Sequence, residues 1–95
     1  MRRAVVEEIL ANLEQVTRDG TRVIVPEGLR VELLCALKDD VLVLGPVKDA
    51  RFGEAYLTVV TENETYFVDY DHVFAVRTKG KAQGRPVGRT GFSPS

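Results

Sequence analysis

The sequence predicts a mainly β domain in which an N-terminal α-helix precedes five or six antiparallel strands, curved into a strongly bent sheet or a small barrel. Near the N-terminus, apolar residues recur every three or four positions, which is typical of a helix. After Gly20, short alternating segments are separated by Gly, Pro, Asn and Asp, the pattern of strands joined by tight turns. Strands and helices do not alternate along the chain, so a parallel sheet is not expected.

Residues Arg3 to Arg18 are expected to form an amphipathic helix that packs against the sheet. Its apolar stripe consists of Val5, Ile9, Leu13 and Val16, widened by Val6 and Leu10. Asp19-Gly20 is expected to end this helix, because glycine readily adopts the left-handed conformation of a helix C-terminal cap.

Three strands are predicted in the first half of the chain. Thr21 to Val25 forms a short strand before Pro26. Leu29 to Leu37 has the clearest alternation, and its odd-numbered residues, Cys35 included, share one face. Val41 to Val47 follows. From Leu29 to Leu44 both faces are rich in apolar residues, which in so short a chain favours a homo-oligomer.

Two features interrupt this strand pattern. Gly45-Pro46 predicts a bend or bulge, since proline cannot donate a hydrogen bond to a central ladder. Lys48 to Gly53 is expected to be a polar loop in which Phe52 is exposed or tucked inward.

The segment Glu54 to Arg77 is expected to form a β-hairpin and one further strand. Ala55, Leu57 and Val59 alternate with polar or aromatic neighbours, so their side chains fall on one face. Glu62-Asn63-Glu64 is the predicted turn, because asparagine tolerates turn geometry. The chain then resumes as strands from Thr65 to Tyr70 and from His72 to Thr78.

Length and charge divide the chain into one domain, residues 1–78, and a basic Gly/Pro-rich C-terminal tail, residues 79–95. From Arg77 onward there are five of the 13 basic residues and none of the 14 acidic ones, so the first 76 residues carry a net charge of −6. The composition of the tail indicates a flexible segment that contacts nucleic acid or a partner, or folds back on the acidic body.

The sequence also bears on location and redox chemistry. No apolar run approaches the roughly 20 residues needed to span a bilayer, and Glu7 and Glu8 interrupt any signal-peptide core, so a cytoplasmic protein without membrane contact is expected. Cys35 is the single cysteine, which rules out an internal disulfide. Its place on an apolar strand face predicts a buried packing residue rather than a reactive thiol.

The run Tyr70-Asp71-His72-Val73, followed by a strand and a basic tail, resembles the entry to the last strand in the Sm-like family, which includes the Hfq-like RNA chaperones. The resemblance implies a helix followed by a bent five-stranded sheet, with Tyr70 and His72 at subunit contacts and around an RNA-binding pore. Asp71 stands where the family has a lysine. SH3-like barrels fit the same strand pattern.

No motif specifies a reaction, and a non-catalytic protein is expected. Asp69, Asp71 and His72 could bind a cation, but their spacing matches no metal motif, and a solvated strand edge or turn is favoured. Tyr56, Tyr66, Tyr70 and Phe67 could stack on bases, although core or interface packing is favoured. Neither a metal nor a cofactor is predicted.

The resulting functional prediction is a binding module that contacts RNA or another nucleic acid through the basic tail and one face of the domain. Cationic tails bind phosphates without reading sequence. The candidate nucleic-acid-binding residues are Arg77, Lys79, Lys81, Arg85, Arg89, Tyr70 and His72. The alternative is a protein-interaction or oligomeric scaffold module with no nucleic-acid role.

Overall fold

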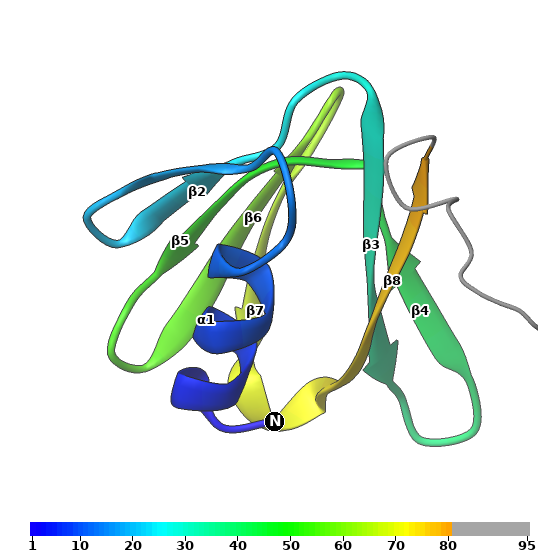
Figure 1. The fold of residues 1–95 in the computed structure, drawn as a ribbon. Coiled ribbons are helices and arrows are strands. Elements are labelled where there is room, and N and C mark those ends of the chain that lie inside the picture. The colour runs from blue at the N-terminus through cyan, green and yellow to red at the C-terminus, as the bar shows by residue number, and fades with distance from the viewer. Residues whose placement is uncertain (81–95) are drawn as a thin grey trace, which may run out of the picture.

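A computed structural model describes residues 1–80, which form one short helix and two antiparallel sheets (Figure 1). The five-stranded sheet has the order β1-β2-β5-β6-β7 and the three-stranded sheet the order β4-β3-β8. The elements are α1 (Arg3–Ala11), β1 (Thr17–Asp19), β2 (Arg22–Ile24), β3 (Leu29–Ala36), β4 (Val41–Leu44), β5 (Val47–Phe52), β6 (Tyr56–Thr61), β7 (Thr65–Asp69), the 3₁₀ turn η1 (Tyr70–His72) and β8 (Val73–Gly80).

The predicted fold class, a leading helix followed by antiparallel strands, is confirmed. The strands number eight rather than five or six, and within residues 1–80 they form two sheets and no closed barrel. The 3₁₀ turn η1 separates β7 from β8 and carries the chain from one sheet to the other. The strand orders make β1 and β7 the edges of the larger sheet, and β4 and β8 the edges of the smaller one.

The core lies between the inner faces of the two sheets, and α1 covers it. Val31 and Leu33 of β3 and Leu57 and Val59 of β6 have no exposed surface. Val6 and Leu10 of α1 complete this core. Burying each such Val or Leu side chain contributes about 1.5–3 kcal/mol, so the shared interior is what holds the two sheets together.

The helix is shorter than the sequence prediction of Arg3 to Arg18. It ends at Ala11, and the Asn12 side-chain amide donates to the Glu8 carbonyl oxygen at 2.8 Å, which satisfies an acceptor at the helix end. Gln15 then has a φ of 74°, and the chain enters β1, which pairs with β2. Gly20, with a φ of 63°, lies in the turn of that hairpin rather than at a helix cap.

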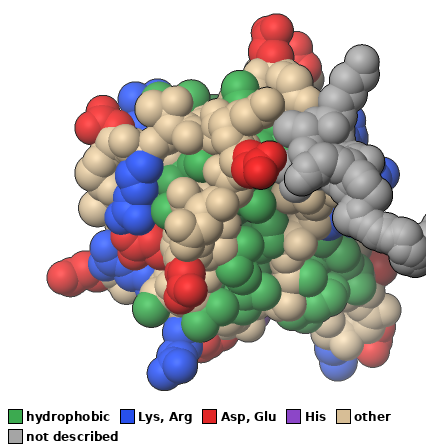
Figure 2. All heavy atoms as spheres, viewed as in Figure 1, with side chains coloured by type: hydrophobic (Ala, Val, Ile, Leu, Met, Phe, Trp, Pro, Cys, Tyr) green, Lys and Arg blue, Asp and Glu red, His purple; other side chains and the backbone are tan. Residues whose placement is uncertain are grey.

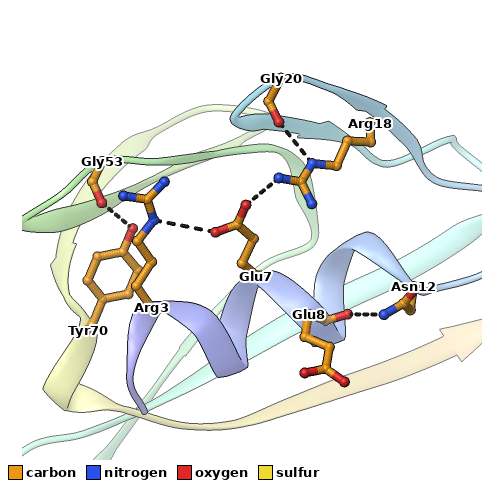
Figure 3. A network of polar contacts seen from close by, with 8 residues as sticks. All are labelled: Arg3, Glu7, Glu8, Asn12, Arg18, Gly20, Gly53 and Tyr70. Carbon is orange, nitrogen blue, oxygen red and sulfur yellow. Dashed lines mark hydrogen bonds and ion pairs between the residues drawn. The ribbon is translucent and has the colours of Figure 1, made fainter.

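Charged side chains connect α1 to the β1–β2 hairpin (Figure 3). Glu7 accepts a hydrogen bond from Arg3 Nε at 3.4 Å and another from Arg18 on β1. Arg18 also donates from Nε to the Gly20 carbonyl oxygen at 2.8 Å. The arginine expected at the end of the helix therefore fixes the hairpin against it.

The predicted polar loop Lys48 to Gly53 is wrong, because this segment is β5, an interior strand of the five-stranded sheet. Val47, Ala50 and Phe52 are buried, and a β-bulge between Val47 and Asp49 shifts the register against β6. Because charged residues lie between the apolar ones, the sequence pattern does not indicate a strand here. Phe52 is tucked inward, 3% exposed.

The predicted bend at Gly45-Pro46 is confirmed as the junction of β4 and β5, and its peptide bond is cis. Gly45 lies directly against β3. A Cβ atom added to it would lie 2.8 Å from Glu32 Cγ and 3.0 Å from the Val31 carbonyl oxygen. Only glycine fits at this contact without displacing its neighbours.

The remaining strand predictions are confirmed with small shifts of their ends. β6 and β7 form the expected hairpin around Glu62–Glu64, where the Thr61 N–H donates to the Glu64 carbonyl oxygen at 2.8 Å. β3 buries its odd-numbered residues as predicted but ends at Ala36, so that Leu37 is half exposed.

Candidate interaction surfaces

An apolar groove of about 160 Å³ lies in the gap between edge strands β4 and β7. Its apolar lining includes Cys35 of β3, Leu37 just after β3, Leu42 and Leu44 of β4, and Tyr66, Phe67 and Val68 of β7. Asp69 and His72 add polar groups. We call this the seam groove.

Two strand edges flank the seam groove, and the hydrogen-bond alternation of antiparallel pairs shows which backbone groups they present. The Leu37 N–H donates to the Asp40 carbonyl oxygen at 2.9 Å, which sets the phase of the β3–β4 ladder. In that phase the peptide groups of Val41 and Val43 point away from β3. The bond between Thr61 and Glu64 sets the phase of β7 in the same way, so that the peptide groups of Phe67 point away from β6.

These edges differ in how much of their hydrogen-bonding capacity is already used. The Val41 N–H donates to the neighbouring Asp40 carboxylate at 2.7 Å. Within residues 1–80 no side chain hydrogen-bonds to the backbone of Phe67 in this way, and the residue is 69% exposed. The β7 edge is therefore the more open of the two for pairing with an added strand.

A second apolar surface lies on the outer face of the three-stranded sheet. In β4, Val41 and Val43 point to this face, whereas Leu42 and Leu44 point to the groove. The surface, which we call the outer patch, comprises Leu34, Ala36, Val41, Val43, Phe74 and Ala75. Val41, Val43 and Phe74 are 46%, 44% and 49% exposed. Figure 2 shows hydrophobic side chains gathering over the region where Figure 1 draws the lower half of this sheet.

An ion cluster occupies the other half of the same outer face. Glu32 of β3 is 5% exposed and accepts from Arg77 Nε at 2.7 Å and from Arg30 Nε at 3.1 Å. The hydrogen bond from Arg77, together with that from Arg30, holds the pKa of the Glu32 carboxyl below its usual value although burial opposes this. The alternation of β3 places Glu32 on the outer face, and the sequence pattern does not predict its burial against Gly45.

The five-stranded sheet carries a similar cluster on its outer face. Arg22 Nε donates to Asp49 Oδ2 at 2.6 Å, and Arg51 Nε lies 3.8 Å from Asp49 Oδ1. The hydrogen bond to Asp49 and the charge of its carboxylate raise the pKa of Arg22. Asp49 is 7% exposed. Because the sequence pattern predicts a polar loop here, it does not predict the burial of Asp49.

Those predicted nucleic-acid-binding residues that fall within residues 1–80 lie in three different places. Arg77 and Lys79 lie on the outer face of β8, opposite Glu32 and Arg30 of β3. Tyr70 is buried, its hydroxyl donates to the Gly53 carbonyl oxygen at 2.6 Å (Figure 3), and burial raises the pKa of its phenol. His72 is exposed and lines the seam groove. Lys81, Arg85 and Arg89 lie outside the described residues, as does most of the predicted tail.

The other residues singled out by sequence have structural positions. Asp69 and Asp71 do not project side by side from a regular strand, because Asp69 Oδ1 accepts from the Asp71 N–H at 3.0 Å and caps η1. Residues 1–80 contain no group of three His, Cys, Asp or Glu side chains placed to hold a metal ion. Cys35 is buried as predicted, and burial raises the pKa of its thiol.

The four aromatic residues considered as a stacking surface are divided between the two sides of the sheet. Tyr56 and Phe67 make an edge-to-face contact with ring centroids 5.8 Å apart on the outer side of β6 and β7. Tyr66 packs against the core, where Tyr70 is buried. Only Tyr56 and Phe67 therefore share an exposed surface.

Comparison with known proteins adds no relative: no protein-family model, curated protein or solved structure matches this chain. Within residues 1–80, the helix is too short to cross a membrane.

Proposed function

We propose that this protein is a non-catalytic protein-interaction module whose seam groove binds an extended peptide segment of a partner protein. The observation that carries the proposal is an apolar groove bordered by two strand edges. Extended peptides bind such edges by adding a strand, so that backbone hydrogen bonds supply affinity and alternate side chains enter pockets that supply specificity.

The lining of the groove defines the chemistry of the peptide. A groove of about 160 Å³ is close in size to the cavity of about 150 Å³ that accommodates a benzene ring in another protein, so one aromatic or branched aliphatic side chain fits as an anchor. Asp69 lines the groove and Asp71 lies nearby on η1, both exposed. A basic residue close to the apolar anchor matches this charge.

Selection from a displayed library of random peptides on the full chain tests the proposal. Enriched peptides are expected to carry apolar residues at alternate positions and to bind in the micromolar range, because one anchor and a short ladder must offset the ordering of the peptide. Leu42→Lys places a charge in the groove and should weaken binding at least tenfold.

Val43→Lys is the matched control, because Val43 is the next residue on β4, is similarly exposed and points to the opposite face. It should leave peptide affinity unchanged. Equal affinity of the selected peptides for wild type and Leu42→Lys, or enrichment of no peptide at all, contradicts the proposal.

Nucleic-acid binding is a second candidate, favoured by the juxtaposition of Arg30, Arg77 and Lys79 on the outer face of the three-stranded sheet. These residues precede a segment with three further cations at Lys81, Arg85 and Arg89. Such a surface would bind phosphates with a strong dependence on salt.

Fluorescence anisotropy with a single-stranded RNA oligonucleotide at about 50 and 200 mM salt distinguishes this candidate. Lys79→Ala should reduce affinity and flatten the salt dependence, whereas Lys48→Ala, on β5, should change neither. Absence of binding at the lower salt concentration removes nucleic acid from consideration.

A further inference from the structure

We infer that the outer patch is a self-association surface, on which a second copy of this chain docks with its three-stranded sheet antiparallel to the first. The patch faces away from the core, and its residues do not line the seam groove. This inference is therefore independent of peptide binding. It rests on the arrangement of charge around the patch.

The outer face is basic at one end and acidic at the other. Arg30, Arg77 and Lys79 surround Glu32 at the end of the sheet where β3 begins and β8 ends. At the opposite end, Asp39 and Asp40 share the β3–β4 turn with Lys38, and Asp71 lies on η1 at the start of β8, so three carboxylates face one ammonium group there. All three acidic residues are exposed.

One two-fold arrangement brings these opposite charges together. When the axis runs across the strands through the row Val43–Leu34–Ala75, each strand lies over its own counterpart in the reverse direction. Lys79 pairs with Arg30, four positions from this row on one side, and Asp71 lies on η1, just before the start of β8, on the other side. The rotation therefore brings Lys79 of each copy to the end of the sheet that carries Asp71 in the other copy. The same rotation brings the start of β3, with Arg30, toward the β3–β4 turn, with Asp39, in the second copy.

The arrangement with the strands parallel has the opposite electrostatic result. It places the basic end over the basic end and the acidic end over the acidic end, and like charges facing each other disfavour association. A second copy thus supplies, in one orientation, both an apolar surface for the patch and the opposite charge for each end. Isologous contacts of this kind are the commonest in soluble oligomers.

The size of the sheet sets the expected strength of self-association. Three strands of up to eight residues span roughly 10 Å by 26 Å. The area of this rectangle is well below the area of about 800 Å² that each partner usually buries in a stable complex. We therefore expect a weak dimer, with a dissociation constant on the order of 10 µM.

Sedimentation equilibrium of the full chain between about 1 and 200 µM tests the inference, because these concentrations bracket that constant. Wild type should pass from monomer to dimer over this range. Val43→Lys places two ammonium groups next to the axis and should weaken the dimer at least tenfold, whereas Leu42→Lys should not. Circular dichroism of each variant verifies that the fold is kept. Monomer throughout the range in wild type, or loss of the dimer in Leu42→Lys alone, overturns the inference.

A charge exchange tests the orientation separately. Lys79→Glu and Asp71→Lys should each weaken the dimer by a few fold, and the double variant should recover most of the wild-type constant because it restores opposite charges across the interface. Recovery supports the antiparallel arrangement. Additive weakening in the double variant shows that Lys79 and Asp71 do not meet, and rejects it.

Discussion

The outer faces of the two sheets carry the same kind of ion cluster, but the residues around the cluster differ. Each carries an almost buried carboxylate between two arginines, Glu32 in the three-stranded sheet and Asp49 in the five-stranded sheet. Beyond the cluster, the five-stranded sheet exposes Ile24 on β2 and the aromatic pair Tyr56 and Phe67 on β6 and β7, whereas the three-stranded sheet exposes the valines of β4 and Phe74. The ion clusters thus belong to the fold of both sheets, and what distinguishes the three-stranded sheet is an aliphatic surface with charged groups of opposite sign at its two ends.

The comparison assumes that both sheets depend on one core. Truncating core side chains tests this, and these substitutions should have the largest effect on the free energy of unfolding. Leu33→Ala on β3 and Leu57→Ala on β6 each remove a fully buried side chain and should lower the free energy of unfolding by about 2–5 kcal/mol. Urea unfolding measures this loss. A near-zero effect for either residue would mean that its sheet does not contribute to a shared interior.

A side chain added at the Gly45 bend, which contacts the Glu32 cluster, should lower the free energy of unfolding by a smaller amount. Gly45→Ala forces its new methyl group against Glu32 Cγ and the Val31 carbonyl, and should cost about 1–3 kcal/mol in urea unfolding. Gly28→Ala is the control, because no atom lies within 4 Å of its added Cβ. Equal stability of the two variants would argue against tight contact between the bend and β3.

The Glu32 cluster should contribute about 1 kcal/mol or less, since solvent screens its half-exposed arginines. Because the folded pKa of Glu32 is below the unfolded value of 4.5, this contribution is fully present above about pH 5 and is lost as the pH falls through the folded pKa. The difference in unfolding free energy between wild type and Glu32→Gln should therefore be constant at neutral pH and shrink below pH 4.5. A difference that grows on acidification would reverse the assigned sign.

The outer patch should matter least to the stability of the monomer. Val43→Thr exchanges one exposed β-branched side chain for another of similar shape, so the free energy of unfolding at low protein concentration should change by less than about 0.5 kcal/mol. A loss above 1 kcal/mol would show that the patch belongs to the core in solution, and would remove the contrast between the two outer faces.

The sequence predicted those parts of the fold in which side-chain period and burial agree. β3 and the β6–β7 hairpin alternate in sequence, and their fully buried apolar residues match the expectation, whereas the burial of Glu32 on the other face of β3 does not follow from the alternation. β5 was missed because Lys48, Asp49 and Arg51 interrupt its apolar residues, and the burial of Asp49 depends on Arg22, 27 residues away in sequence. The helix was overextended because Val16 falls at helical spacing although the backbone turns at Gln15.

The candidate site was less accessible to sequence reasoning, because it arises from elements distant along the chain. The apolar excess between Leu29 and Leu44 corresponds to exposed apolar residues on both faces of β4, but the sequence did not assign Leu42 and Val43 to different surfaces. That separation requires the pairing of β4 with β3 and the position of β7 across the gap. His72 was chosen because the Tyr70–Val73 run resembles an RNA-binding family, and its position in the groove lining did not follow from that resemblance.

The alternation along β4 makes the length of the Leu37–Asp40 connection a determinant of specificity. A single-residue insertion there that shifts the β3–β4 register by one position would move every β4 side chain to the opposite face, turning Val43 inward and Leu42 outward. Relatives that differ by one residue in this connection would therefore exchange their two contact surfaces while keeping nearly the same composition, and would have different binding partners.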